Sequence, residues 1–169
     1  YNRNYSAMQL GGAPPYVLPR VYPEYYGKSD LVMQYTDPGE HDNHFLYIQG
    51  VWVNGKESLR HARVTSDYDD YVALRFYATT VNVVISLEEN DPYDVRVTLD
   101  NQPLRRNQTG TDIMYDDYGN SYIRVDESRM YRLVSTSSYG GHDLRLSSNS
   151  DDFYIFAFTF GAYAGGAES

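Results

Sequence analysis

The residues of this sequence best suited to binding a metal ion lie in two short acidic segments. Glu40-His41-Asp42-Asn43-His44 combines carboxylates with imidazoles, and Asp116-Asp117-Tyr118-Gly119-Asn120 offers oxygen ligands around a glycine. Two histidines at i and i+3 converge on a metal only on a helical turn, which Pro38-Gly39 just upstream disfavours. The second segment lacks the spaced carboxylates and closing glutamate of an EF-hand loop. We interpret the first segment as a solvated polar loop, predict no metal and no cofactor, and leave calcium at the second as an open alternative.

The sequence offers little for catalysis. A serine nucleophile needs a histidine and an orienting acid, and the chain contains no Gly-x-Ser-x-Gly elbow. A carboxylate pair for glycoside hydrolysis would have to face a cleft from two strands. The acids instead gather in turn-like segments such as 67–70 and 88–91, where solvation explains them. We therefore predict that the chain is not an enzyme and has no catalytic residues.

Aromatic and arginine side chains point to binding instead. The chain has 19 Tyr, and its 14 basic residues include only two lysines, Lys28 and Lys56. Arginine stacks on aromatic rings and pairs bidentately with carboxylates, which favours contact with protein or sugar. The single tryptophan, Trp52, is expected in the core. The alternative is a sugar-binding face that uses Trp52 or the outward residues of one strand, Tyr71, Arg75 and Tyr77.

Length and charge narrow the function classes. The 169 residues, 41% of them hydrophobic, suit one domain. A net charge of −9 repels nucleic acid and anionic lipid, and the absence of cysteine excludes disulfides and thiol redox chemistry within this chain. No apolar run is long enough for direct membrane insertion. The first residue is Tyr1, not Met, so we expect a mature product, an excised domain or a chain whose true start is missing.

The two ends of the chain differ from its centre. Residues 1–22 are rich in proline and are expected to form an extended arm that contacts a partner through Tyr1, Tyr5, Tyr16 and Tyr22. Residues 162–169 resemble a flexible tail. Between them, Pro23–Gly27 predicts one helical turn, and Ser29–Tyr35 a short helix.

From Phe45 onward the pattern predicts strands. Phe45–Val53 is followed by Asn54-Gly55, a hairpin signal, and by a return strand over Arg60–Thr65. Further period-two or apolar segments are 71–78, 80–87, 94–100, 122–125, 130–135, 143–147 and 153–160. The last is apolar on both faces, as a strand inside a sheet requires. About nine short strands without a long amphipathic helix predict an all-β, antiparallel β-sandwich of jelly-roll type over residues 23–161.

Five short motifs then suggest a family. They are Pro23-Glu-Tyr-Tyr-Gly27, Gly50-x-Trp52, Val95-Arg-Val-Thr-Leu-Asp-Asn-Gln-Pro103, Arg129-Met-Tyr-Arg-Leu-Val134 and Phe156-Ala-Phe-Thr-Phe-Gly161. In this order, over about Tyr22 to Gly161, the sequence resembles the C-terminal domain of DipZ- and TlpA-type bacterial thioredoxin-fold proteins. Asn101 occupies the position at which the family has a turn glycine. Asparagine fits this position because it tolerates the left-handed backbone conformation that the turn needs.

The resemblance implies a jelly roll like that of carbohydrate-binding modules, located outside the bacterial cytoplasm and usually following a redox domain. The thioredoxin domain and its Cys-x-x-Cys are absent from these residues, so thiol-disulfide exchange does not transfer. Our leading hypothesis is a non-catalytic periplasmic or otherwise extracytoplasmic module, an accessory subunit that docks on protein partners of a larger, membrane-anchored assembly. The alternatives are a carbohydrate-binding module and the C-terminal fragment of a thiol-disulfide oxidoreductase.

Overall fold

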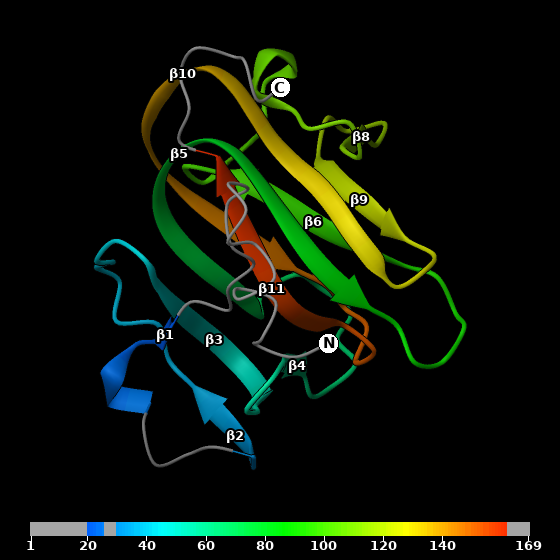
Figure 1. The fold of residues 1–169 in the computed structure, drawn as a ribbon. Coiled ribbons are helices and arrows are strands. Elements are labelled where there is room, and N and C mark those ends of the chain that lie inside the picture. The colour runs from blue at the N-terminus through cyan, green and yellow to red at the C-terminus, as the bar shows by residue number, and fades with distance from the viewer. Residues whose placement is uncertain (1–19, 26–29, 162–169) are drawn as a thin grey trace, which may run out of the picture.

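The structure, a computed structural model, describes residues 20–25 and 30–161, which form an all-β sandwich (Figure 1). Its strands are β1 (Arg20–Val21), β2 (Val32–Tyr35), β3 (Phe45–Asn54), β4 (Leu59–His61), β5 (Tyr71–Ser86), β6 (Tyr93–Leu99), β7 (Gln102–Pro103), β8 (Met114–Tyr115), β9 (Ser121–Val125), β10 (Arg129–Ser147) and β11 (Tyr154–Gly161). Two 3-10 helices accompany them, η1 (Pro23–Tyr25) and η2 (Arg106–Gln108). The described residues include no α-helix. Of the sequence predictions, those for Tyr1, Tyr5, Tyr16 and segment 162–169 fall outside the described residues.

Two long strands organise the sandwich. β5 and β10 are antiparallel neighbours along most of their length. The first half of β5 also pairs with β3, whereas its second half pairs with β11. Each long strand therefore contributes to both layers of the sandwich, and Figure 1 shows the strong curvature that this requires. The predicted antiparallel sandwich of jelly-roll class is confirmed, and the one parallel pair among the described strands is β1 with β3.

Each of these long strands was predicted as two. The prediction separated 71–78 from 80–87, but Thr79 lies buried between them and its hydroxyl donates to the Gly161 carbonyl at 2.9 Å. The strand continues through Thr79 without a turn. Within β10 the register shifts between Ser135 and Gly140, as at a β-bulge, which increases the bend of a strand. Sequence periodicity treats such an irregularity as an interruption, so the nine predicted strands correspond to only seven of the eleven described ones. The prediction missed the short strands β1, β2, β7 and β8.

The N-terminal part of the domain also differs from its prediction. The short helix expected over Ser29–Tyr35 is wrong, because Val32–Tyr35 forms β2 and pairs antiparallel with β3. Residues 20–21 pair with β3 as well, so the sandwich begins before the predicted boundary at 22/23. Tyr22 contacts the rings of Tyr25 and Tyr47 at centroid distances of 5.3 and 5.2 Å. It is thus part of the packed domain, not of a free arm.

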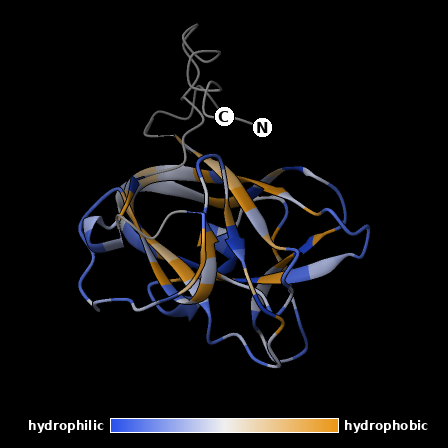
Figure 2. Cartoon of the chain, turned by 90° about the horizontal axis from the view of Figure 1, so that it is seen from below, coloured by the Kyte–Doolittle hydropathy of each residue, from blue (hydrophilic) through white to orange (hydrophobic). Residues whose placement is uncertain are grey.

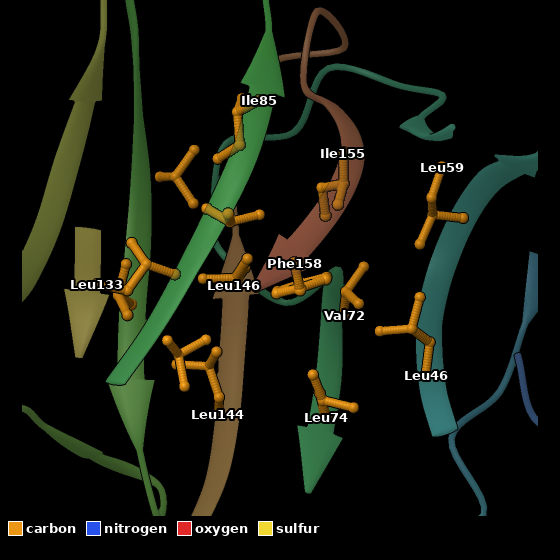
Figure 3. Packing of buried hydrophobic residues seen from close by; sticks show 14 of the residues in the cluster. Leu46, Leu59, Val72, Leu74, Ile85, Leu133, Leu144, Leu146, Ile155 and Phe158 are labelled. Carbon is orange, nitrogen blue, oxygen red and sulfur yellow. The ribbon is translucent and has the colours of Figure 1, made fainter. Parts of the chain in front are cut away.

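The core lies between the two layers. Leu46, Leu74, Ile85, Leu133 and Phe158 point toward one another there, as Figure 3 shows. Hydrophobic residues follow the strands, whereas the connecting loops are mostly hydrophilic (Figure 2). The last strand, β11, lies between β4 and β5. Its predicted position inside the sheet is confirmed, and each large aliphatic or aromatic side chain that the core buries stabilises the fold by about 1.5 to 3 kcal/mol.

Candidate binding groove

The outer face of the sheet carries a groove of about 530 Å³ where β5, β10 and β6 lie side by side. The strands contribute Tyr71, Arg96, Thr98, Arg145 and Ser147. The loop before β5 contributes Asp67, Tyr68 and Asp69, and the turn after β6 contributes Asn101. A volume of this size falls in the range of small-ligand sites.

Strand register fixes the order of these side chains. Arg145 on β10 lies opposite Thr98 on β6, and Ser147 lies opposite Arg96. The two arginines are therefore diagonal neighbours, with Cβ atoms separated by roughly 7 Å in an antiparallel pair. Asn101 is placed beside them by a two-residue turn in which Asp100 and Asn101 both have positive φ, 54° and 65°. Such a turn matches the twist of the strands that it joins.

Each of these arginines stacks on a tyrosine. The guanidinium carbon of Arg145 lies 4.3 Å from the ring centroid of Tyr71, and that of Arg96 lies 4.1 Å from the ring centroid of Tyr68. The negative face of an aromatic ring attracts a cation at this distance. Neither guanidinium forms an ion pair or hydrogen bond with the other residues that the structure describes, and the Arg145 Nε is buried without an acceptor.

A buried ion cluster holds the loop that forms one wall of the groove. The Asp70 carboxylate accepts hydrogen bonds from the Nε and Nη2 of Arg63, both at 2.7 Å, and from the Nε2 of His61 at 2.9 Å. The other ring nitrogen of His61 donates to the Ser150 carbonyl at 2.8 Å. His61 and Asp70 are 0% and 2% exposed. This cluster fixes the end of the 65–70 loop directly before Tyr71.

The Gly-x-Trp motif explains how this cluster fits. Gly50 has φ +105°, and a Cβ on it would lie 2.1 Å from the Asp70 carboxyl carbon. No other residue leaves room for the carboxylate while adopting that conformation. Two residues later, the Trp52 ring packs against the His61 ring at 4.8 Å. The motif is therefore a requirement of the fold.

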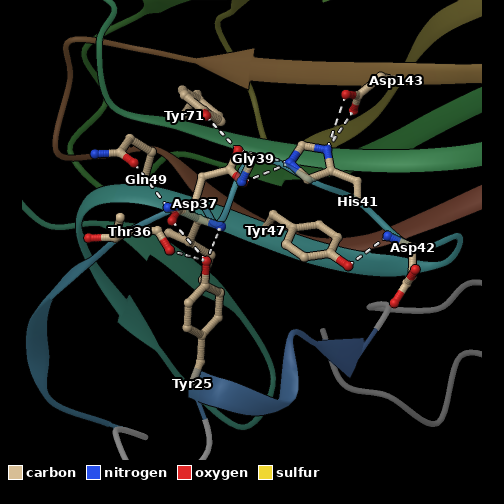
Figure 4. Close-up of polar contacts among 11 residues, drawn as sticks. Tyr25, Thr36, Asp37, Gly39, His41, Asp42, Tyr47, Gln49, Tyr71 and Asp143 are labelled. Carbon is tan, nitrogen blue, oxygen red and sulfur yellow. Dashed lines mark hydrogen bonds and ion pairs between the residues drawn. The ribbon is translucent and has the colours of Figure 1, made fainter.

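A second polar cluster, the His41 network, lies beside the groove (Figure 4). The Nε2 of His41 lies 2.8 Å from Asp37, and its Nδ1 lies 3.1 Å from Asp143 on β10. The imidazole stacks on the Tyr47 ring at 4.2 Å. The Tyr71 hydroxyl donates to Asp37 at 2.5 Å, which locks the tyrosine whose ring lines the groove. Both ring nitrogens of His41 therefore face carboxylate oxygens, which links β10 to the segment before β3.

Burial raises and hydrogen bonding lowers the pKa of the aspartates in these two clusters. Burial alone would raise the pKa of Asp37, but hydrogen bonds from Tyr71, the Gly39 N–H and His41 outweigh it and hold the pKa below its ordinary value. Asp70 behaves likewise, since the hydrogen bonds from Arg63 and His61 outweigh its burial and lower its pKa. The pKa of Tyr71 is raised, first by burial and then by its hydrogen bond to Asp37.

The sequence profile of one family, described as "Thioredoxin like C-terminal domain", matches residues 23–161. The chain belongs to this family. The predicted resemblance is thereby confirmed, and the described residues form the antiparallel sandwich that it implied. A comparison with curated proteins found no match.

Two solved structures are similar to this thioredoxin-like C-terminal domain in fold alone. One is a family two carbohydrate esterase from Clostridium thermocellum in complex with cellohexaose, with a TM-score of 0.43 and 21% identity. The match covers 62% of this chain but only 27% of the esterase chain. The other is CsCBM6-3 from Clostridium stercorarium in complex with cellobiose, with a TM-score of 0.33 and 13% identity over 81% of this chain and 99% of that chain.

The domain brings only one of the four predicted ligand residues into the groove. Tyr71 lines it, whereas Arg75 and Tyr77 lie farther along the same face of β5. Trp52 is 0% exposed, so it lies in the core as expected, and the alternative that it stacks on a sugar is wrong. Tyr77 does lie flat, because a Cβ on Gly141 would meet its ring at 2.7 Å, and it stacks on Tyr139 at 6.0 Å.

Sequence analysis missed the groove residues contributed by other strands. Arg96 and Thr98 are outward residues of β6, and Arg145 and Ser147 are outward residues of β10. Alternation along each strand predicts that they point outward. The alignment of β10 between β5 and β6, which brings them together, is a property of the topology that alternation does not reveal.

The two segments considered for metal binding have other roles in the domain. The interpretation of Glu40–His44 as a solvated loop is wrong for His41, whose side chain is 4% exposed within its network. In the other segment, the Asp116 carboxylate accepts hydrogen bonds from the Tyr118 and Asn120 N–H groups, both at 2.9 Å. Its oxygens close the turn. Within the described ranges, no three acidic or histidine side chains form a metal-binding group, and no helix is long and apolar enough to cross a membrane.

Proposed function

We propose that this domain is a non-catalytic binding module, that the groove is its ligand site, and that the ligand is a saccharide. The observation that supports this most is the lining of the groove, where two tyrosine rings stand beside hydroxyl, amide, carboxylate and guanidinium groups. A sugar has weakly polar C–H faces, which suit the tyrosine rings. Its hydroxyls both donate and accept hydrogen bonds, which suits the polar groups. The groove rests on strands, which hold such groups in fixed positions.

The same lining argues against catalysis. Glycoside hydrolysis needs two carboxyl groups in different environments, one held protonated and one ionised. Asp67 and Asp69 are both exposed and lie two residues apart on one loop. None of the residues that line the groove is a histidine. The lining of the groove thus suits ligand binding but lacks the acid and base pair that glycoside hydrolysis requires.

Affinity electrophoresis through gels containing soluble glycans tests this function. A retained protein should lose most of its retention in Tyr68→Ala, because this substitution removes one ring and releases Arg96 from its stack. Tyr118→Ala is the matched control, since Tyr118 is 91% exposed on the turn before β9 and does not line the groove. Absence of retention on every glycan, or equal loss in both variants, would contradict the proposal.

The second candidate is protein docking, as an accessory subunit outside the cytoplasm. One observation favours it: Leu31 and Val32 are 56% and 58% exposed at β2, which pairs only with β3 among the described strands. Exposed apolar side chains at a strand edge suit the addition of a partner's strand. The predicted contacts Tyr1, Tyr5 and Tyr16 precede the sandwich, so deletion of residues 1–19 keeps β1. If the arm docks, this deletion should abolish co-purification of the partner while thermal unfolding is unchanged; retained co-purification would refute arm docking.

The remaining alternative, a fragment of a thiol-disulfide oxidoreductase, fits the family description but assigns no redox chemistry to these residues. The chain contains no cysteine, so any exchange would depend on another part of a longer protein. For localisation we propose the bacterial envelope, which separation of periplasmic, cytoplasmic and membrane fractions would test. Recovery of the native protein in the cytoplasmic fraction alone would refute it.

A further inference from the structure

The arginines of the groove differ from the ion-paired arginines of the domain. Three of the described arginines have an acidic partner at ion-pair distance: Arg63 with Asp70, Arg124 with Asp94 and Arg129 with Asp112. Arg96 and Arg145 have none among the described residues, although the chain has 23 acids and 14 bases. Other described arginines, such as Arg75, also lack an ion pair, but Arg96 and Arg145 are set apart because they are diagonal neighbours and the Nε of Arg145 is buried without an acceptor.

Their arrangement makes the lack of an acceptor costly. The two side chains are diagonal neighbours across β10 and β6, so two positive charges lie close together on one face. Both are partly withdrawn from water, and the Nε of Arg145 is buried without a hydrogen bond. Stacking on Tyr68 and Tyr71 holds the guanidinium planes but supplies no acceptor. A bound anion would supply acceptors and offset the mutual repulsion of the pair.

We propose that the groove recognises a saccharide that carries a carboxylate, that is, a uronic acid residue, through Arg96 and Arg145. This inference rests on the proposed function and specifies its ligand. Arginine pairs with a carboxylate through parallel N–H donors, which gives both affinity and orientation. Thr98, Ser147 and Asn101 lie around the two arginines and can bond the hydroxyls of the same sugar ring.

The charges around the groove favour a single carboxylate over a polyanion or an acidic peptide. Asp67 and Asp69 accept hydrogen bonds from sugar hydroxyls but repel any further carboxylate of the ligand. The net charge of −9 disfavours a densely charged ligand in the same way. A neutral sugar ring with one acid group matches both the paired cations and the flanking acids.

NMR titration of the domain with two matched ligands tests the inference. Methyl glucuronide and methyl glucoside share the same ring, and they differ in whether carbon 6 is a carboxylate or a hydroxymethyl group. We expect the glucuronide to bind at least tenfold more tightly and to shift signals of β6 and β10. Arg96→Gln and Arg145→Gln should each weaken glucuronide binding about tenfold while leaving glucoside binding within about twofold. Arg106→Gln is the control, since Arg106 stacks on Tyr115 at 4.4 Å outside the groove.

The possible outcomes separate this inference from the proposed function. If glucoside binds as tightly as glucuronide and Tyr68→Ala weakens both, the saccharide function stands and the carboxylate inference is overturned. If neither sugar nor any glycan gel retains the protein, both fail. If acetyl-Gly-Glu-Gly binds more tightly than glucuronide with the same dependence on Arg145, the ligand is an acidic peptide and the inference is wrong.

Discussion

The His41 network and the groove lie beside each other on one face of the sheet. They differ in whether their charged side chains have hydrogen-bond partners within the domain. In the network, both nitrogens of His41 face carboxylates, and Asp37 is further satisfied by Tyr71 and the Gly39 N–H. In the groove, Arg145 has an aromatic ring beneath it but no acceptor within the described structure. Tyr71 belongs to both regions, since its hydroxyl donates a hydrogen bond to Asp37 of the network and its ring lines the groove.

This difference distinguishes polar residues that stabilise the fold from those that are available to a ligand. Buried charges that are paired and hydrogen-bonded are accounted for by the domain itself, and removing one partner is costly. A charged group that the fold holds in place without a partner has no such internal role. The comparison therefore predicts that substitutions in the ion clusters reduce stability, whereas substitutions in the groove reduce binding.

The largest loss of stability is expected for Asp70→Asn. This change keeps the size of the side chain but leaves the buried His61 and the Arg63 guanidinium without their carboxylate. We expect the free energy of unfolding, measured by urea denaturation, to fall by about 4 kcal/mol. Asp94→Asn is the control, because Asp94 pairs with Arg124 at the exposed surface and such pairs contribute about 1 kcal/mol or less. Equal effects of the two would show that the Asp70 cluster is not a special anchor.

His41→Ala tests the network next to the groove. It leaves Asp37 and Asp143 without the imidazole that lies between them, and we expect a loss of about 3 kcal/mol in the free energy of unfolding. His142→Ala is a matched control: the Nδ1 of His142 lies 2.7 Å from Asp100, but the aspartate side chain is 51% exposed. Its loss should be about 0.5 kcal/mol. If His142→Ala were as damaging as His41→Ala, burial would not be what separates the two pairs.

Sequence reasoning predicted the sandwich well because alternation and turn residues report local geometry. It placed Tyr71, Arg75 and Tyr77 on one face of β5 and the last strand inside the sheet, and both agree with the structure. It failed where geometry depends on partners distant in the chain. His41 is buried by Asp143, which lies 102 residues away, and Arg145 meets Arg96 only through the β10–β6 register. No local sequence pattern predicts the contact of His41 with Asp143 or the proximity of Arg145 to Arg96.

Acidification should weaken the ion clusters by a smaller amount. The pKa values of Asp37 and Asp70 are lower in the folded chain than in the unfolded one, where the pKa of an aspartate is about 3.9. Their stabilisation is therefore complete above about pH 4 and is lost as the pH falls through the folded values. Urea midpoints from pH 6 to pH 2.5 should decline below about pH 4, and Asp37→Asn should decline less steeply, by about 1 kcal/mol in total. A parallel decline would mean that Asp37 does not contribute to acid sensitivity.

The smallest effect on stability is expected for Arg145→Gln, and it is the most direct test of the comparison. Its matched control is Arg129→Gln, because Arg129 also stacks on a tyrosine ring, at 3.8 Å from Tyr131, but in addition pairs with Asp112 at 3.0 Å. Without ligand, Arg145→Gln should change the free energy of unfolding by less than about 0.5 kcal/mol, because relief of repulsion with Arg96 offsets the lost stacking.

Arg129→Gln should cost about 1.5 kcal/mol, because it removes both the stacking and a charge-assisted hydrogen bond. If Arg145→Gln lowered stability as much as Arg129→Gln, the groove would be one more satisfied cluster of the fold. If it left stability intact while weakening glucuronide binding, Arg145 would be a residue that the fold holds in position for a ligand. The unpaired cation is then the feature that separates the binding surface of this domain from its scaffold.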